Sequence, residues 1–354
     1  MRPIRVLVAD DSAFMRTALT RMIESDPGLQ VSDTAQTGTE ALEKIRIRQP
    51  DVVTLDVEMP GLNGLETLKR IMTDLPRPVI MVSSLTQEGA ETTLEALDIG
   101  AFDYVPKQQS YASLDIVKIR DELIAKVKAA AETVRRKPMA SIKPRSSTSG
   151  SVLHRLAVVQ PAVVAVGTST GGPKALQQIL PMLPADLPVG VLVVQHMPPG
   201  FTGPFARRLD NLCKVSVREA TENQAVDPGV VYIAPAGQHM TVVRQASAKV
   251  AIHLSLSPES TLHRPSVDVL MLSVAEVFGR LGMGIIMTGM GADGVKGMKA
   301  IADAGGLTVG QDEPSCVVYG MPRSCAEAGV LRRVVSLGGI PQQILQAIHY
   351  RKQA

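Results

Sequence analysis

Residues 4–12 read Ile4-Arg-Val-Leu-Val-Ala-Asp10-Asp11-Ser12, an apolar run that ends abruptly in two carboxylates. A run of this length, bounded by polar residues, predicts a buried β-strand. The stretch that follows, residues 13–25, carries apolar side chains at three- and four-residue spacing and predicts a helix. A strand followed directly by a helix is the first half of a βαβ unit, which favours a parallel sheet.

The same alternation continues over the first 130 residues. Further strands are predicted at 31–35, 52–55, 79–82 and 102–105. The helical patterns lie at 13–25, 38–48, 64–74, 89–99 and 114–134. Five βα units imply a five-stranded, doubly wound parallel sheet with helices on both faces.

Periodicity stops between residues 135 and 160 and then resumes. Lys137-Pro138, Lys143-Pro144 and the Ser/Thr/Gly-rich residues 146–150 are typical of a flexible connector. Later strands are predicted at 162–166, 189–194, 230–233, 251–256, 284–287 and 307–309, with helices at 173–183, 267–278 and 295–304. The fold class is therefore α/β, with two doubly wound parallel-sheet domains, the second larger and Rossmann-like.

Charge and composition exclude several classes of protein. The formal net charge is +3, but six basic residues and no acid lie between 135 and 155, which leaves about −3 elsewhere. No domain has the basic excess of a nucleic-acid binder, so the basic stretch is interpreted as a solvated linker. Without a signal-like start or an 18-residue apolar run, we expect a cytoplasmic chain that does not insert into membranes. Cys213, Cys316 and Cys325 have no metal-binding or disulfide spacing.

Carboxylates follow two strands of the first domain. Asp10 and Asp11 come directly after the first strand, and Asp56 ends the third. In a parallel sheet the carboxyl ends of all strands lie at one edge, so these side chains should converge. A cluster of carboxylates suits Mg²⁺. Ser83 and Lys107, past the fourth and fifth strands, would reach the same edge and could bind phosphoryl oxygens on Asp56.

This set of residues resembles the receiver domains of bacterial two-component response regulators. The matching motifs are Val8-Ala-Asp10-Asp11-Ser12, Leu55-Asp56-Val-Glu-Met-Pro60, Met81-Val-Ser83-Ser84 and Asp103-Tyr-Val-Pro-Lys107. The resemblance covers residues 1–125. It implies phosphoryl transfer from a histidine kinase to Asp56, with Mg²⁺ at Asp10, Asp11 and Asp56 and with Ser83 and Lys107 as switch residues.

A glycine-rich turn follows the first strand of the second domain. It reads Gly167-Thr-Ser169-Thr170-Gly171-Gly172, and Pro173 suits the first turn of a helix. Gly-x-Ser-x-Gly at such a turn can present a nucleophile on a sharp bend. A glycine-rich turn before a helix can equally hold a phosphate on its amides, so the turn alone leaves both interpretations open.

Two further residues favour the nucleophile. His196 and Asp293 also follow predicted strands, and a serine needs a base oriented by a carboxylate to react. Amides near Thr170 and Met290 could bind an oxyanion. The order Ser, His, Asp differs from that of α/β-hydrolases, which indicates another fold. The remaining histidines are assigned structural or surface roles: His154, His239, His253, His263 and His349.

The second domain resembles the catalytic domain of chemotaxis protein-glutamate methylesterases. The matching segments are residues 167–172, Gln195-His196-Met-Pro198, Tyr232-Ile-Ala-Pro-Ala-Gly237, Arg264-Pro-Ser-Val-Asp268 and Thr288-Gly-Met290-Gly-Ala-Asp293-Gly294. The resemblance implies a catalytic domain at 161–350, after a helix end and flexible basic linker at 126–160. It implies hydrolysis of glutamate methyl esters, and deamidation of glutamines, on chemoreceptor helices by Ser169, His196 and Asp293 without a cofactor, with backbone amides at Met290 and Thr170 binding the oxyanion. We expect a monomer.

Two alternatives remain open at this point. The second domain could bind nucleotide or a partner protein without turnover, or it could bind DNA, although nearly 200 residues of α/β pattern argue against a DNA-binding module. A linker of about 25 residues and the placement of both sites at strand ends lead to one more hypothesis. The unphosphorylated receiver would obstruct access to Ser169.

Overall fold

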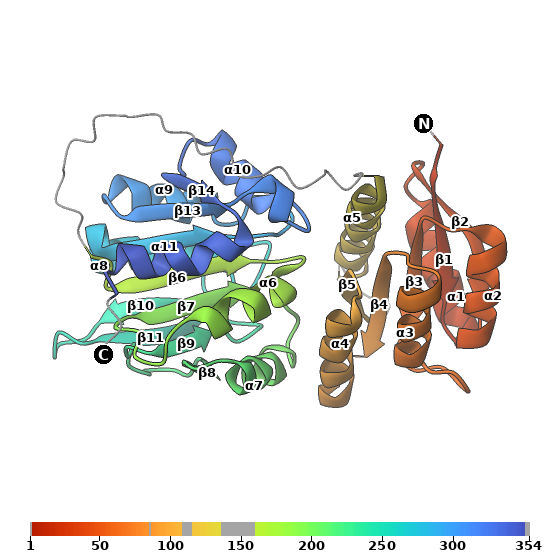
Figure 1. The fold of residues 1–354 in the computed structure, drawn as a ribbon, viewed down its shortest axis with the longest axis horizontal. Coiled ribbons are helices and arrows are strands. Elements are labelled where there is room, and N and C mark those ends of the chain that lie inside the picture. The colour runs from red at the N-terminus through yellow and green to blue at the C-terminus, as the bar shows by residue number, and fades with distance from the viewer. Residues whose placement is uncertain (1, 85, 108–114, 136–159, 351–354) are drawn as a thin grey trace. The chain divides into compact units, whose positions relative to one another are not determined.

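The computed structural model describes residues 2–84, 86–107, 115–135 and 160–350 (Figure 1). The chain forms two compact units, residues 1–156 and 157–354. Most of the predicted connector, residues 136–159, lies outside the described residues. Each unit is described by itself below.

The first unit is built around a five-stranded sheet of order β2-β1-β3-β4-β5 in which all pairs are parallel. Helices α2, α3 and α4 pack in a row, and α1 packs against α5. The elements in chain order are β1 (Ile4–Ala9), α1 (Ala13–Glu24), β2 (Leu29–Ala35), α2 (Gly38–Arg48), β3 (Val52–Asp56), α3 (Gly64–Asp74), β4 (Val79–Ser84), α4 (Gln87–Ile99), β5 (Asp103–Lys107) and α5 (Asp115–Arg135).

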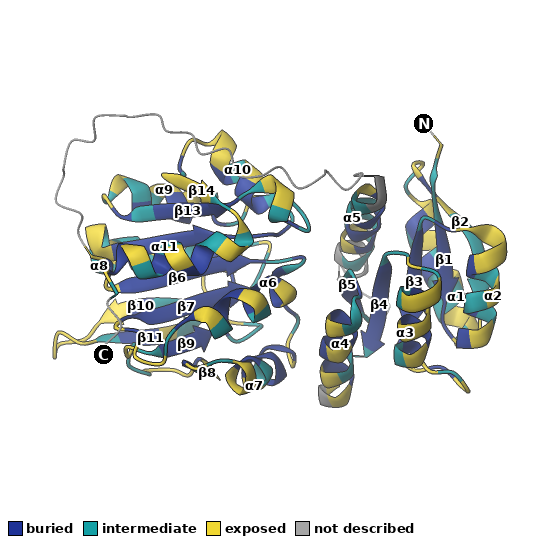
Figure 2. Ribbon diagram, in the orientation of Figure 1, coloured by how far each residue is buried: buried dark blue, intermediate teal, exposed yellow. Residues whose placement is uncertain are grey.

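Local signals explain where these helices begin. The side chains of Ser12, Thr37 and Asn63 accept hydrogen bonds from the first turns of α1, α2 and α3, as helix N-caps do. Asn63 and Glu66 form a reciprocal capping box. The strands β1 and β3 are buried almost throughout, which agrees with their continuous apolar sequence (Figure 2).

The second unit contains a seven-stranded sheet of order β14-β13-β12-β6-β7-β9-β8, again with every pair parallel. Its elements are β6 (Val163–Thr168), α6 (Gly172–Ile179), η1 (Leu180–Met182), β7 (Gly190–Gln195), α7 (Thr202–Leu212), β8 (Ser216–Glu219), β9 (Val230–Ile233), β10 (His239–Arg244), β11 (Val250–Ser255), α8 (Val267–Phe278), η2 (Gly279–Leu281), β12 (Gly282–Ile286), α9 (Val295–Asp303), β13 (Leu307–Gln311), η3 (Glu313–Ser315), α10 (Met321–Glu327), β14 (Arg333–Val335), η4 (Leu337–Gly339) and α11 (Ile340–Ala347).

The strand predicted at 251–256 exists but does not join the parallel sheet. It forms β11, which pairs antiparallel with β10 in a separate hairpin. Five residues connect the two strands, and a parallel pair needs a crossover of about a dozen or more residues. The sequence analysis did not predict the short outer strands β8 and β14, because three or four residues are too few to show a period.

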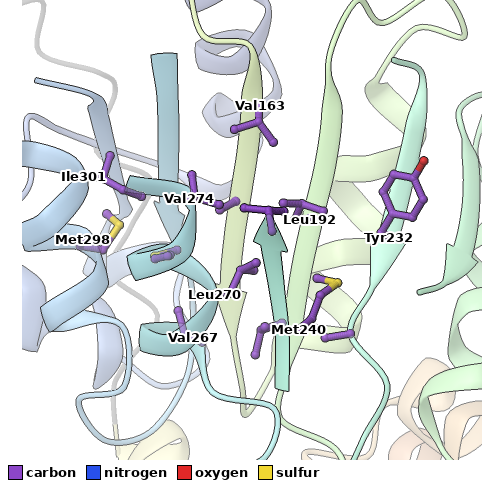
Figure 3. Packing of buried hydrophobic residues seen from close by; sticks show 14 of the residues in the cluster. Val163, Leu192, Tyr232, Met240, Val267, Leu270, Val274, Met298 and Ile301 are labelled. Atoms are coloured by element: carbon purple, nitrogen blue, oxygen red, sulfur yellow. The ribbon is translucent and has the colours of Figure 1, made fainter. Parts of the chain in front are cut away.

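Helix α8 occupies the centre of the larger core. Its side chains Val267, Leu270 and Val274 meet Leu192 from β7 and Met298 from α9 in one buried cluster (Figure 3). The hairpin β10–β11 packs against the same helix. Because these contacts hold α8 from several sides, the N-terminus of α8 can hold a side chain such as Asp293 in a fixed position.

Among the helices of the described residues, none is both long enough and apolar enough to cross a membrane.

Candidate functional site

The strand order brings the three predicted catalytic residues to one edge. Strand β6 lies between β12 and β7 in the sheet. Thr168 and Gln195 are register partners at the ends of β6 and β7, and Ser169 and His196 are the next residues along each strand. The backbone N–H of His196 donates to the carbonyl of Thr168 at 3.1 Å. Asp293 lies in the loop after β12, so the sheet gathers all three residues.

Gln195 ties the first two segments together. This side chain is buried, and its amide nitrogen donates to the carbonyl oxygens of both Ser169 and His196, each at 3.0 Å. A Cβ at Gly172 would lie 2.0 Å from Oε1 of Gln195, so the glycine lets helix α6 approach this side chain closely. No role was predicted for Gln195, although it belongs to the matching segment Gln195-His196-Met-Pro198.

The turn that carries Ser169 is sharp, as its glycines predict. Gly171 has φ +77°, a conformation that favours glycine, and Gly172 begins α6 with Pro173 in its first turn. The N–H of Gly172 donates to the carbonyl of Ser169 at 2.8 Å. Ser169, which precedes these glycines, is half-buried.

The predicted oxyanion amides belong to two segments that meet at Ser169. Thr170 is next to the serine, and Met290 follows Gly289, whose Cβ would lie 2.9 Å from the Cβ of Ser169. Among the described residues, no group accepts a hydrogen bond from the backbone N–H of Thr170 or of Met290. Both amides thus lie in segments next to Ser169 without a protein acceptor among the described residues.

His196 and Asp293 are in direct contact. Nε2 of His196 lies 2.8 Å from Oδ2 of Asp293. The other ring nitrogen, Nδ1, is buried and has no hydrogen-bond partner among the described residues. The ring thus contacts the carboxylate through Nε2, and Nδ1 makes no hydrogen bond to Ser169.

The N-terminus of α8 holds the Asp293 carboxylate. Oδ1 accepts from Oγ of Ser266 and from the N–H of Asp268, both at 2.9 Å, and Oδ2 accepts from the N–H of Val267 at 2.8 Å. Burial alone would raise the pKa of Asp293, but the hydrogen bond and charge of His196, together with the helix amides, lower it well below its ordinary value. Asp293 is accordingly a fixed anion beside His196.

Asp268, in the first turn of α8, binds the start of α9. Its Oδ1 accepts from the N–H groups of Gly294 and Gly297, at 3.0 and 2.8 Å, and so caps the start of α9 just after Asp293. Burial raises the pKa of the Asp268 carboxyl. The loop before α9 therefore supplies Asp293 to the N-terminus of α8, and α8 supplies Asp268 to the N-terminus of α9. Ser266 and Asp268 were part of a matching segment of the sequence but had no role assigned, although a serine before a helical pattern is a recognised N-cap signal.

His239 is a fully buried support behind this arrangement. Its Nδ1 accepts from the N–H of Ser266 at 3.2 Å, so Nε2 carries the proton and faces the carbonyl of Pro258 and Oγ1 of Thr261, at 3.2 and 3.1 Å. Burial lowers the pKa of His239 below its ordinary value. These contacts fix the chain between Pro258 and α8.

His263 lies against the ring of His196. The two ring centroids are 4.0 Å apart and the planes are inclined by 20°, which is a stacked pair. The structure thus brings to the site a histidine for which the sequence indicated only a structural or surface role. The two residues lie far apart in the chain, so no local pattern could have found the stack.

The acidic residues of the first unit also converge. Ligand atoms of Asp10, Asp11 and Asp56 lie within 4.8 Å of one another. Nζ of Lys107 lies 2.6 Å from Oδ2 of Asp56 and 3.1 Å from Oδ2 of Asp10. Burial raises the pKa of Asp56 to about 6, with the Lys107 contact lowering it and the Asp10 charge raising it. An oxygen-only cluster with excess negative charge fits a hard divalent cation such as Mg²⁺.

Ser83 is buried at the same edge of the sheet, but its hydroxyl faces α4. Oγ of Ser83 donates to the carbonyls of Gly89 and Ser84, at 3.1 and 3.3 Å. Ser83 and Lys107 were expected just past the fourth and fifth strands, but both lie within the last residues of β4 and β5, which pair in parallel, because these strands are longer than predicted. The Ser83 hydroxyl would have to turn to reach a group on Asp56.

Comparisons with known proteins agree with this geometry. A family model described as CheB methylesterase matches residues 164–344, and a response regulator receiver domain model matches residues 6–117. The protein-glutamate methylesterase/protein-glutamine glutaminase 1 of Oleidesulfovibrio alaskensis is 46% identical over 98% of this chain and 100% of that protein. The chain belongs to the CheB methylesterase family.

Two more relatives of the CheB methylesterase family support this assignment. The protein-glutamate methylesterase/protein-glutamine glutaminase of Symbiobacterium thermophilum is 49% identical, with 98% of each chain covered. The crystal structure of the Thermotoga maritima CheB methylesterase catalytic domain matches with a TM-score of 0.52 and 40% identity, over 53% of this chain and 99% of that one. Membership in the CheB methylesterase family confirms the resemblance, the α/β fold class and the methylesterase class of enzyme with a receiver domain.

Proposed function

We propose that this chain hydrolyses glutamate methyl esters, and deamidates glutamines, on the cytoplasmic helices of chemoreceptors when Asp56 is phosphorylated. One observation carries the proposal. In a chain of the CheB methylesterase family, Ser169, His196 and Asp293 lie at the carboxyl ends of three adjacent strands, with the His–Asp pair already hydrogen bonded. These positions fit the roles of nucleophile, base and orienting carboxylate.

The first step of the proposed reaction forms an acyl-enzyme. Oγ of Ser169 attacks the side-chain carbonyl carbon, and its proton passes to Nδ1 of His196. The imidazolium that forms is stabilised through Nε2 by the Asp293 carboxylate, whose lowered pKa keeps it ionised. The carbonyl oxygen becomes an oxyanion, which the N–H groups of Thr170 and Met290 would bind.

The second half of the reaction releases the products. His196 returns its proton to the leaving group, so that an ester gives methanol and an amide gives ammonia. A water molecule then loses a proton to His196 and attacks the acyl carbon, which leaves glutamate on the receptor and restores Ser169. The proposed chemistry uses only side chains and backbone amides of this chain.

In the receiver, an oxygen of Asp56 attacks the phosphorus of a phosphohistidine on a kinase, and the P–N bond breaks. Asp10, Asp11 and Asp56 would hold Mg²⁺, which when bound neutralises charge on the phosphoryl oxygens. Lys107 already lies 2.6 Å from Asp56 and would pair with the new group, and Ser83 could turn toward it. These roles make Ser83 and Lys107 the proposed switch residues.

We propose that the receiver controls the esterase by obstructing access to its active site. The unphosphorylated receiver, residues 1–125, blocks access to Ser169 in the catalytic domain, residues 161–350, across the basic linker at 126–160. Phosphorylation adds about two negative charges and shifts the population toward open states. We further propose that the protein acts as a cytoplasmic monomer, which sedimentation at working concentration would test.

The decisive experiment measures methanol release from methylated receptor, with and without a small phosphodonor. We expect the phosphodonor to stimulate the wild type, Asp56→Asn to lose that stimulation, and Ser169→Ala to lose turnover in both conditions. A second domain that only binds a partner would not release methanol, and methanol release by Ser169→Ala would exclude it as the nucleophile. A chain beginning at Ser151 tests obstruction, because it should match the phosphorylated full-length protein.

A further inference from the structure

The stacked pair of His263 and His196 places a second imidazole on the ring proposed as the base. The centroid distance of 4.0 Å and the 20° inclination leave no room for water between the two rings. His263 reaches this position from the loop before α8, and it is half-buried. The contact is therefore part of the surroundings of the reacting nitrogen.

A base in this geometry needs a second restraint. The Asp293 contact holds Nε2 of His196 at 2.8 Å, but one hydrogen bond fixes a point on the ring and not the tilt of its plane. Nδ1, which has to take the proton of Ser169, has no hydrogen-bond partner among the described residues. A ring stacked on the face of His196 limits the tilt that would swing Nδ1 away from the serine.

The loop that carries His263 is itself held on both sides. Oγ1 of Thr261, two residues before, contacts Nε2 of the buried His239 at 3.1 Å. The carbonyl of Arg264, one residue after, accepts a 3.0 Å hydrogen bond from Gly237. Since both flanks are anchored, the ring can transmit a fixed orientation to His196.

We propose that His263 is a positioning residue for His196. Its stacked ring limits the tilt of the imidazole plane of His196 and so keeps Nδ1 oriented toward Ser169. The inference rests on the proposed roles of Ser169 and His196. It assigns to His263 no proton transfer and no contact with the substrate.

The test measures methanol release from methylated receptor by the full-length protein with saturating phosphodonor. His263→Ala should lower kcat by roughly tenfold to a hundredfold, as small misplacements of reacting groups do, with KM within about twofold of wild type. His263→Phe keeps a stacking ring and should recover most of kcat. His253→Ala is the matched control, because His253 lies on the exposed hairpin and contacts Glu222, and it should leave kcat unchanged.

A second measurement reports on activation of Ser169 without the receptor substrate. The rate at which a fluorophosphonate labels Ser169 reports its activation, and it should fall in His263→Ala in parallel with kcat. The inference is overturned if His263→Ala keeps the wild-type kcat or the wild-type labelling rate. It is also overturned if His263→Phe folds but is no more active than His263→Ala. Ser169→Ala in the same series keeps the outcomes distinct: if it still releases methanol, the proposed function fails, whatever His263 does.

Discussion

Oγ of Ser266 donates a 2.9 Å hydrogen bond to Oδ1 of Asp293, and the same Ser266 side chain is the N-cap of α8. One hydroxyl thus serves the helix and the site. The helix amides that follow it bind the same carboxylate, and a helix N-terminus favours negative charge. The orientation of Asp293 therefore depends on α8, which the large core fixes.

Ser266→Ala should lower both activity and stability. Loss of the N-cap should cost about 1 kcal/mol of unfolding free energy. Loss of one hydrogen bond to a buried carboxylate should lower kcat by about tenfold, because Asp293 is then less firmly oriented. Thr37→Ala removes the N-cap of α2 in the receiver and is the control: urea unfolding should show a similar loss, with kcat unchanged. Equal kcat in Ser266→Ala and wild type would contradict the role given to this hydroxyl.

Gln195→Leu should impair catalysis while it keeps the volume of the side chain. The two carbonyls of Ser169 and His196 lose their shared donor, so the serine and the base are no longer tied together. We expect kcat to fall roughly tenfold or more and the unfolding free energy to fall by about 1–3 kcal/mol. Gln343→Leu, on α11, should change neither quantity in the same methanol-release and urea-unfolding assays.

His239 should make the catalytic domain less stable in acid. Its folded-state pKa is lowered by burial, so the unfolded chain binds the proton more readily. The contribution of neutral His239 is present above the ordinary pKa of about 6.5 and is lost as the pH falls below it. Unfolding of wild type and His239→Gln between pH 5 and 8 would show this, since only the wild type should lose stability through this group. Parallel pH curves for the two proteins would rule it out.

Asp56 should have the opposite effect in the receiver without Mg²⁺. Its folded-state pKa is raised to about 6, so at neutral pH the ionised carboxylate is less favourable in the folded protein than in the unfolded chain. Asp56→Asn should therefore raise stability at pH 7.5 by up to about 3 kcal/mol, and the gain should shrink as the pH falls toward 4. Saturating Mg²⁺ should stabilise the wild type more than Asp56→Asn. Asp121→Asn, at an exposed position, should show no such pH-dependent gain.

Most of the strands and helices, and the sheet edge at which the chemistry lies, follow from the sequence pattern. Strands such as β1 and β6 are continuous apolar runs, and the parallel arrangement sends every residue that follows a strand to one side. Asp56, Ser169, His196 and Asp293 could be placed at this edge for this reason, and Ser169 was favoured as a nucleophile only together with His196 and Asp293. Asp293 was expected to orient His196, but it lies seven residues beyond the end of β12, and its anchoring by the N-terminus of α8 did not follow from the pattern.

The contacts that hold the site come from packing between distant parts of the chain. The tertiary structure set β6 between β12 and β7, turned β10–β11 into a separate hairpin, and brought His263 onto His196. It also raised the pKa of Asp56, which depends on burial that no motif specifies. Periodicity reports which face of one element is apolar, whereas these features are contacts between residues distant in the chain. In the second unit, packing of the core around α8 fixes the arrangement of the site.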